Sequence, residues 1–259
     1  MSEAVIQSLK QGAIGTITLN RPEAMNTFTI PFAKQLDAAL WEMENDPEIR
    51  VVLIKANGKN FSTGISLEQF DNRSQHEFRA FLYQIDAFYH TLAKMKTITI
   101  SAVQGYALAN GAGLAFATDF TIATECSSFG TTAINVGLIC LGPAAPMMRI
   151  IGRKKTMEMV LTGEIISSHQ ALQLGLINQV VTEEQLEDAA TTLADKLTKK
   201  SPLALQIGKE GLNRLADSPN YDQALDTMDD LFATLCATAD ATEGVTAFLE
   251  KRPPVWQGK

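Results

Sequence analysis

Two glycine-containing loops have the residue types and spacing that favour chemistry carried out by the backbone. Residues 61–66 (FSTGIS) follow the apolar run IRVVLIKA, and residues 105–113 (GYALANGAG) follow ITISAV and precede the helical stretch LAFATDF. At the start of a helix, free N–H groups and the positive end of the dipole face the same point. Two N–H groups that converge on one carbonyl oxygen form an oxyanion hole, and losing one donor typically costs about 3–4 kcal/mol of barrier. Each loop alone is equally compatible with a tight turn.

Other residues that commonly carry catalysis or bind metals are sparsely placed. The histidines His76, His90 and His169 form no HExxH motif or Cys/His cluster, so we expect no bound metal. GYALANGAG does not match GxGxxG, and no GxxxxGK[ST] loop is found, so we expect no nicotinamide or flavin cofactor. The stretch GISLE at 64–68 begins like a nucleophile elbow but lacks the final glycine, which argues against a serine hydrolase.

Alternating strands and helices must position the two loops. Apolar patterns and turn signals predict strands at 13–19, 49–56 and 98–103. Helical spacing predicts one helix that starts at Thr29 and another from Gln75 to Lys94. This order is typical of parallel crossover units in an α/β protein. Further helices are predicted at 183–200, 202–215, 221–237 and 240–250. A helical tail after an α/β core is either a lid or an oligomerisation element.

The composition is that of an ordinary globular protein, because 46% of the 259 residues are hydrophobic and 20% are charged. A net charge of −7 argues against broad binding to nucleic acid or anionic membranes. Residues 97–148 carry only two charges, Asp119 and Glu125, so we expect this segment to be buried in a core or around an apolar cavity. Three widely spaced cysteines and the absence of a signal-like start lead us to expect a soluble cytoplasmic protein.

Along nearly its full length the chain resembles the crotonase superfamily, the enoyl-CoA hydratase/isomerase proteins. The stretches that carry the resemblance are LNRPEAMN (19–26), NFSTGISL (60–67), VQGYALANGAGLAFATD (103–119), FGTTAINVG (129–137), GR (152–153), MVLTG (159–163), ALQLGLINQVV (171–181) and EGVTAFLEKR (243–252). The stretches FLEKRPPVW and NVGLICLGP look most like the enoyl-CoA hydratase domain-containing branch. The resemblance implies a spiral of ββα units, with an acyl-CoA-binding core at 1–198 and a helical trimerisation region at 199–259. Members usually form trimers, often paired into hexamers.

The resemblance also assigns residues to the site. It places the first oxyanion N–H on Ile65, just after Gly64. It places the second on Asn110, just before Gly111, in a slot that usually holds glycine; the asparagine would narrow the pocket or add a donor. The residues that it places along coenzyme A are Ala24, Met25, Thr63, Ser66 and Leu67.

Two residues near the end of the chain match family positions that reach coenzyme A from a neighbouring subunit. Phe248 would cover the adenine, and Lys251 would reach a phosphate. Lys251 is equally compatible with a solvated charge. Coenzyme A is expected as part of the substrate, and the expected partners are acyl-CoA and further copies of the same chain.

The acidic residues of the family are missing from this chain. Family hydratases use two glutamates to handle the water and the proton at the α-carbon. The matching positions here are Gly113 and Ala133, and a third acidic slot is Leu141. No side chain at these three positions moves a proton.

Several other groups are candidates to replace the missing acids. Cys140 lies beside the third slot, and a thiol near a helix N-terminus has a lowered pKa, although a small buried hydrophobe is the alternative. Glu68 and Asp71 follow the first loop and would serve only if that region folds over the site. The remaining candidates are Thr131 and Asn135 for holding a water, and Tyr83 and His90 beside the acyl tunnel.

Three functions remain open on the sequence. The first is a lyase or isomerase acting on an acyl-CoA thioester in fatty acid metabolism, in which the oxyanion hole stabilises an enolate; decarboxylation and thioester hydrolysis belong to the same class. The second is a catalytically inactive oligomer that binds coenzyme A. The third is a scaffolding oligomer with an incidental pocket. Residues 131–148 predict an apolar environment for the acyl group.

Overall fold

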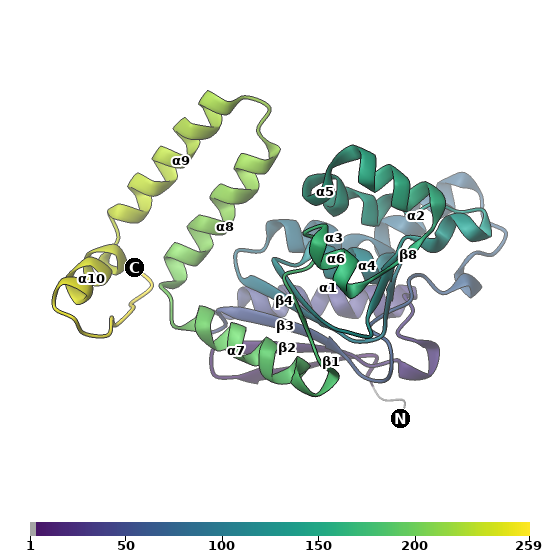
Figure 1. Cartoon of the computed structure of the whole chain (residues 1–259), viewed down its shortest axis with the longest axis horizontal. Helices are drawn as coiled ribbons and strands as arrows, with labels where there is room; N and C mark the ends of the chain where they lie inside the picture. The colour runs from purple at the N-terminus through teal and green to yellow at the C-terminus, as the bar shows by residue number, and fades with distance from the viewer. Residues whose placement is uncertain (1–3) are drawn as a thin grey trace.

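The computed structural model describes residues 4–259 and contains two sheets with helices packed around them (Figure 1). The larger sheet has the strand order β1 (Ile6–Gln11), β2 (Ile14–Leu19), β3 (Val51–Ala56), β4 (Ile98–Val103), β6 (Phe120–Thr124) and β9 (Gln179–Val181). Its strands are parallel except for the β1–β2 hairpin. The smaller sheet has the order β5 (Tyr106–Leu108), β7 (Ser128–Gly130) and β8 (Ile165–Ser167).

The helices fill the connections between strands and then form the C-terminal part of the chain. The α-helices are α1 (Ile30–Asn45), α2 (Gln75–Ile85), α3 (Ala87–Lys94), α4 (Asn110–Ala117), α5 (Leu141–Thr162), α6 (Ser168–Gln173), α7 (Leu186–Thr198), α8 (Pro202–Asp217), α9 (Tyr221–Cys236) and α10 (Ala239–Leu249). Short 3-10 turns are η1 (Pro22–Ala24), η2 (Leu67–Gln69), η3 (Thr132–Val136) and η4 (Glu183–Gln185).

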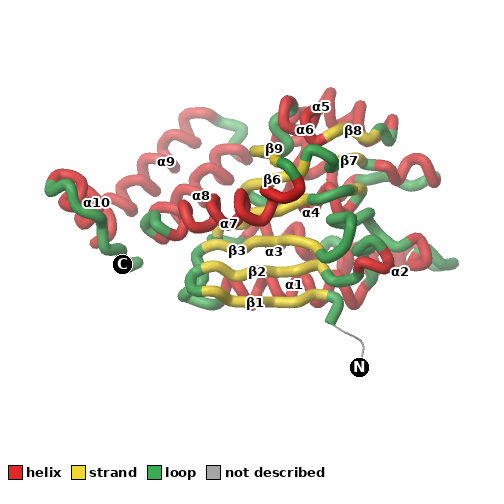
Figure 2. The backbone as a smooth tube through the Cα atoms, turned by 60° about the horizontal axis from the view of Figure 1, so that its bottom comes forward, coloured by secondary structure: helices red, strands yellow, loops and turns green. Residues whose placement is uncertain are grey.

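The period-two pattern of the central strands builds a core on each face of the larger sheet. In β3, Val52 and Ile54 belong to the main core, whereas Leu53 belongs to a smaller core that includes Ala190 and Ala194 of α7. Figure 2 shows α1 and α3 on one side of the strands and α7 on the other. Both faces are therefore covered, as a parallel sheet requires.

The α/β fold, the three predicted strands and the four late helices are confirmed, but the sequence prediction missed β1 and β5–β9, and one predicted helix is wrong. β1 was not predicted; five of its six residues are exposed, so it shows no alternating apolar pattern. The single helix predicted from Gln75 to Lys94 is wrong, because the chain breaks into α2 and α3 at Asp86 (φ −95°, ψ 5°). The apolar spacing continues through the break, so helical periodicity does not reveal it.

Helices α8, α9 and α10 project away from the two sheets (Figure 1). An ion pair fastens α8 to the larger sheet: Lys209 Nζ lies 2.7 Å from Asp119 Oδ2 and also donates to the carbonyl of Thr97. The same carboxylate oxygen accepts hydrogen bonds from the backbone N–H and hydroxyl of Thr99. The Lys209 side chain is only 6% exposed, so this pair is a buried interaction.

Replacing Lys209 is expected to destabilise the protein strongly. In Lys209→Met the partly buried Asp119 carboxylate loses its counter-ion, which typically costs about 3–5 kcal/mol of unfolding free energy. Urea unfolding measures the loss. The matched control on the same helix is Glu210→Gln, which breaks a surface pair with Arg214 and should cost less than about 1 kcal/mol. Equal small losses in the two variants would contradict this reading of the contact.

Candidate functional site

The two loops singled out in the sequence lie side by side in the fold. The backbone N–H of Ser62 donates to the carbonyl of Tyr106 (3.1 Å), and the N–H of Leu108 donates to the carbonyl of Ser62 (2.9 Å). Loop 61–66 is thereby paired with β5, which leads directly into α4. On its other side, the loop pairs with Phe28. The Phe28 N–H donates to the Gly64 carbonyl, and the Ser66 N–H donates to the Phe28 carbonyl.

This pairing fixes the direction of the Ile65 amide. Because Phe28 bonds to the residues before and after Ile65, the N–H of Ile65 points away from Phe28, as alternate residues of an extended chain do. Gly64 adopts φ +94°, and a Cβ atom placed on it would lie 2.7 Å from the Cβ of Ala109 and 3.5 Å from the amide nitrogen of Asn110. The glycine thus lets the first loop approach the start of α4 closely.

The first turn of α4 presents free backbone donors at the same place. Its N-cap, Ala109, has φ +48°, a region that residues other than glycine rarely adopt, and no side chain caps the helix. In residues 4–259 the amides of Ile65 and Asn110 donate to no protein acceptor. Strained backbone of this kind clusters at functional sites. The structure therefore brings close together the two amides that the family resemblance assigns to the oxyanion hole.

Gly111 is required where the helix meets the first loop. A Cβ atom on Gly111 would overlap the carbonyl oxygen of Ser62. The contact is between two stretches of backbone, so it cannot be relieved by a side-chain rotation.

The residues predicted to line coenzyme A are held together by Asn26. Its side-chain oxygen accepts from the Arg21 N–H (2.7 Å), and its side-chain nitrogen donates to the carbonyls of Asn57 and Asn60 (both 3.0 Å). The N–H of Thr63 donates to the Met25 carbonyl (3.2 Å). These hydrogen bonds of the LNRPEAMN segment hold Ala24 and Met25 beside loop 61–66; we call the Asn26 contacts the Asn26 clamp. The residues of this group with exposed side chains are Met25 and Leu67.

The space beside Gly113, the position predicted to match the first family glutamate, is filled by another residue. A Cβ atom on Gly113 would overlap the hydroxyl of Tyr89. Among the described residues this hydroxyl is buried and has no hydrogen-bond partner. Burial raises the pKa of Tyr89 well above its ordinary value, so the phenol stays protonated. Tyr89, which the sequence did not single out, occupies the space that a glutamate would need.

The other two slots and Cys140 lie around the start of α5. Ala133 is half-buried in η3, and Leu141 is 69% exposed. Thr131, two residues before Ala133, has a buried hydroxyl without a partner in the described chain. Cys140 is the N-cap of α5, but burial raises the pKa of its thiol, so the lowered pKa expected from its helix position is wrong.

The structure adds an acidic residue that the sequence reasoning missed. The side-chain nitrogen of Asn110 donates to Asp86 Oδ1 at 2.8 Å. Both carboxylate oxygens of Asp86 lie about 3.5 Å from the point where a Cβ atom on Gly142 would stand. Burial raises the pKa of Asp86, the Asn110 hydrogen bond opposes the rise, and nearby His90 opposes it further. The available signal was that Asp86 is the one acid between positions 78 and 94.

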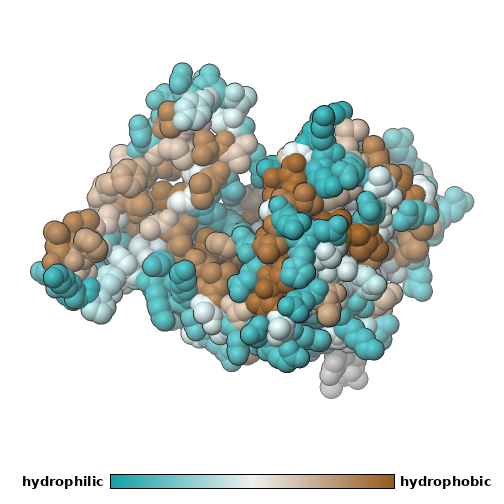
Figure 3. All heavy atoms as spheres, in the orientation of Figure 1, coloured by the Kyte–Doolittle hydropathy of each residue, from teal (hydrophilic) through white to brown (hydrophobic). Residues whose placement is uncertain are grey.

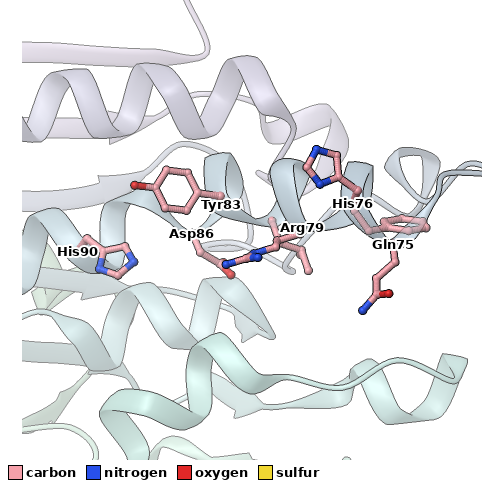
Figure 4. A pocket seen from close by; sticks show the side chains of 8 residues that line it. Gln75, His76, Arg79, Tyr83, Asp86 and His90 are labelled. Carbon is pink, nitrogen blue, oxygen red and sulfur yellow. The ribbon is translucent and has the colours of Figure 1, made fainter.

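Asp86 also lines a groove of about 750 Å³ along α2 and α3. Figure 4 shows Tyr83, Asp86 and His90 at one end of this groove, and Gln75 and His76 at the other. The remaining lining residues are Phe78, Arg79 and Leu82. Tyr83 and His90, which the sequence analysis placed beside an acyl tunnel, both line this groove.

Other candidates lie outside this arrangement. Glu68 and Asp71 are exposed, and Asp71 pairs with Arg73 at 2.6 Å. Phe248 is 82% exposed on α10, and Lys251 follows it; Figure 1 places α10 far from α4 within one chain. In residues 4–259 no three His, Cys, Asp or Glu side chains gather closely enough to hold a metal ion.

The comparisons with known proteins identify the family. A family model described as Enoyl-CoA hydratase/isomerase matches residues 9–259, so the chain belongs to that family, within the crotonase superfamily. It is 33% identical over 242 residues to "Probable enoyl-CoA hydratase echA8" of Mycobacterium bovis, covering 93% of each chain. It is 32% identical to "Enoyl-CoA hydratase domain-containing protein 3, mitochondrial" of Danio rerio, covering 98% of this chain and 88% of that protein. The predicted superfamily and its domain-containing branch are thereby confirmed.

Solved structures agree with this assignment. An enoyl-CoA hydratase of Mycobacterium smegmatis matches with a TM-score of 0.94 and 30% identity, covering 98% of this chain and 99% of that chain. Human enoyl-CoA hydratase domain-containing protein 3 matches with a TM-score of 0.92 and 29% identity, covering 97% and 100%. The crotonase-like fold is confirmed. The prediction that the chain is an enzyme of the hydratase/isomerase type is confirmed at the level of the family. In residues 4–259 no helix combines the length and apolar character needed to cross a bilayer.

Adding one methyl group at Gly111 is expected to disrupt the site. In Gly111→Ala the new Cβ would push α4 away from Ser62, and overpacking of this kind typically costs about 1–3 kcal/mol of unfolding free energy. The matched control is Gly208→Ala, because Gly208 is also helical but has no atom within 4 Å of its Cβ position. This control should gain about 0.5–1 kcal/mol. Thermal unfolding of both variants checks the difference, and a stabilised Gly111→Ala would show that the backbone contact is not tight.

Proposed function

We propose that this protein binds acyl-CoA thioesters and polarises the thioester carbonyl between the amides of Ile65 and Asn110. The observation that carries the proposal is that these two N–H groups lie on adjacent loops and donate to no acceptor in the described chain. When the α-carbon loses a proton or a carboxylate group, negative charge develops on the carbonyl oxygen. The two N–H groups donate to this oxygen and so stabilise the enolate. Coenzyme A enters as part of the substrate and lies along Ala24, Met25, Thr63, Ser66 and Leu67.

The reaction we favour is one that needs a single proton-transfer group. Hydration uses two acidic side chains, whereas Gly113, Ala133 and Leu141 carry none. Decarboxylation needs less acid–base assistance, and isomerisation or thioester hydrolysis would use another base. An inactive oligomer that binds coenzyme A is the second candidate, and the filling of the Gly113 slot by Tyr89 favours it. We place the activity in fatty acid metabolism and in the cytoplasm, although several relatives have "mitochondrial" in their names.

We further propose that the chain works as a trimer, alone or paired into a hexamer, with residues 199–259 as the trimerisation region. Figure 3 shows apolar surface over the projecting helices. The exposed apolar side chains of these helices are Leu212, Leu215, Leu225, Phe232, Val245, Phe248 and Leu249. A monomer seldom exposes so much apolar surface, which supports an assembly that buries it. In such an assembly the family resemblance places Phe248 and Lys251 beside the coenzyme A of a neighbouring subunit.

Calorimetric titration tests the binding proposal. Acetyl-CoA and crotonyl-CoA should bind more tightly than free coenzyme A, because only the thioesters offer a carbonyl to the two amides. The enoyl-thioester absorbance of the crotonyl-CoA samples reports any turnover, which we expect to be slow. Gly111→Ala should bind thioesters and free coenzyme A equally. If none of the three ligands binds the wild-type protein, the acyl-CoA proposal is wrong.

Restoring the two glutamates is expected to fail unless Tyr89 is also changed. In Gly113→Glu with Ala133→Glu, the new side chain collides with the Tyr89 ring, so crotonyl-CoA hydration should stay near the wild-type rate. Adding Tyr89→Ala opens the space, and the triple variant should hydrate crotonyl-CoA measurably faster. Circular dichroism and calorimetry check that each variant folds and binds. A rise in hydration with the glutamates alone would show that Tyr89 does not block the slot.

A further inference from the structure

We propose that Asp86 is the acid/base residue of this site, which takes a proton from the α-carbon of the bound thioester and returns it to the substrate. The inference rests on the proposed function, because it needs the thioester carbonyl to lie between Ile65 and Asn110. It supplies the proton-transfer group that Gly113, Ala133 and Leu141 do not.

One residue links Asp86 to the carbonyl site. Asn110 offers its backbone N–H to the oxyanion position and its side-chain nitrogen to Asp86 Oδ1 at 2.8 Å. In a thioester the α-carbon is bonded directly to the carbonyl carbon. A carboxylate anchored to the residue that holds the carbonyl oxygen is therefore within reach of the α-proton. The asparagine in this slot thus has a use that a glycine would not have, namely to orient the base.

Asp86 also faces the space where an acyl chain fits. It lines the groove along α2 and α3 (Figure 4). Phe78 and Leu82 also line this groove and provide apolar side chains. The groove continues past Asp86 to His90 and Tyr83. An acyl chain that runs along this wall from the thioester would pass the carboxylate near its α-carbon.

The break between α2 and α3 leaves the carboxylate available. Asp86 is both the C-cap of α2 and the N-cap of α3, yet its side chain makes no capping hydrogen bond to α3. An aspartate at an N-cap normally accepts from the N2 or N3 amide. The carboxylate therefore does not stabilise the start of α3 and accepts from Asn110 instead. An aspartate with a purely structural role would be expected to cap the helix.

The neighbouring titratable groups do not compete for this role. From α3, Tyr89 stays protonated in its buried position, and His90 lies at the exposed end of the groove. From the start of α5, Cys140 is a buried thiol with a raised pKa. Asn110 of α4 is uncharged. From α2, Arg79 and Tyr83 line the same groove as Asp86 (Figure 4), and the Arg79 guanidinium is a cation that accepts no proton. A partly desolvated carboxylate is a stronger base than an exposed one, which suits abstraction of a weakly acidic C–H proton.

The step balances without a co-reactant. The carboxylate of Asp86 forms an O–H bond with the α-proton, and the C–H electron pair becomes the carbon–carbon double bond of the enolate. The carbonyl π pair moves to oxygen, which the two amides stabilise. When the substrate is a 3-enoyl thioester, return of the proton to the γ-carbon moves the double bond into conjugation. Return to the α-carbon restores the substrate.

The test follows 3-hexenoyl-CoA with the full-length protein in D₂O. Mass spectrometry measures deuterium in the thioester, and absorbance measures the conjugated product. Asp86→Asn keeps the shape of the side chain and removes the base, so incorporation should fall at least about 100-fold while calorimetry still detects binding. The control is Glu68→Gln, an exposed carboxylate after the first loop, which should leave incorporation unchanged.

A pH series separates a catalytic role from a structural one. Wild-type incorporation should rise with pH as Asp86 ionises, and Asp86→Asn should lose this limb. Because the folded-state pKa is raised, ionisation opposes folding, so wild-type stability should fall relative to Asp86→Asn as pH rises through that pKa. An Asp86→Asn protein that unfolds or loses thioester binding would show a structural role and overturn the proposal.

The possible results also separate the role of Asp86 from the proposed acyl-CoA-binding function on which it rests. If the wild-type protein binds the thioester but neither incorporates deuterium nor forms the conjugated product, or if Asp86→Asn does both at the wild-type rate, Asp86 is not the base although acyl-CoA binding stands. If the wild-type protein binds no thioester, the proposed function itself fails, and the role of Asp86 fails with it.

Discussion

The site depends on a close contact between two backbones, that of Ser62 and that of the first turn of α4. Ser62 pairs through its N–H and carbonyl with β5, and that carbonyl also lies where any side chain on Gly111 would be. The hydroxyl of Ser62 donates to the Asn26 carbonyl, so the clamp made by Asn26 is joined to the same point. Because backbone has no rotamers, this contact fixes the positions of the Ile65 and Asn110 amides more rigidly than side chains would.

The polar groups around this rigid centre come from an unexpected part of the chain. At the position where hydratases of the family are expected to carry the first glutamate, Gly113 leaves room that Tyr89 fills. The carboxylate that accepts a hydrogen bond from the Asn110 side chain belongs to Asp86, at the break between α2 and α3. If Asp86 replaces the glutamate that is absent from α4, the carbonyl site is unchanged. The proton would then reach the substrate from the side of α3 instead of from α4.

Much of the arrangement was readable in the sequence, and the rest depends on tertiary contacts. Apolar periodicity located β2, β3, β4 and the late helices, and the two loops were recognisable from their glycines and their place after strands. The contact of Asp86 with Asn110 spans 24 residues and requires α3 and α4 to pack in one particular way. Periodicity cannot show this, because Ile85, Tyr89 and Leu92 continue the apolar face through the break. The burial of Cys140 likewise follows from packing, and it reverses the pKa shift expected from a helix N-terminus.

The most direct measurement of the carbonyl site is isotope-edited infrared spectroscopy of an acyl-CoA labelled with ¹³C at its thioester carbonyl. Two hydrogen bonds to the carbonyl oxygen weaken the C=O bond, so the labelled stretch should move to lower frequency when the thioester binds the wild-type protein. The shift should disappear in Gly111→Ala, in which the two amides no longer converge. An unshifted carbonyl band in a sample where calorimetry shows the thioester to be fully bound would contradict the oxyanion-hole assignment.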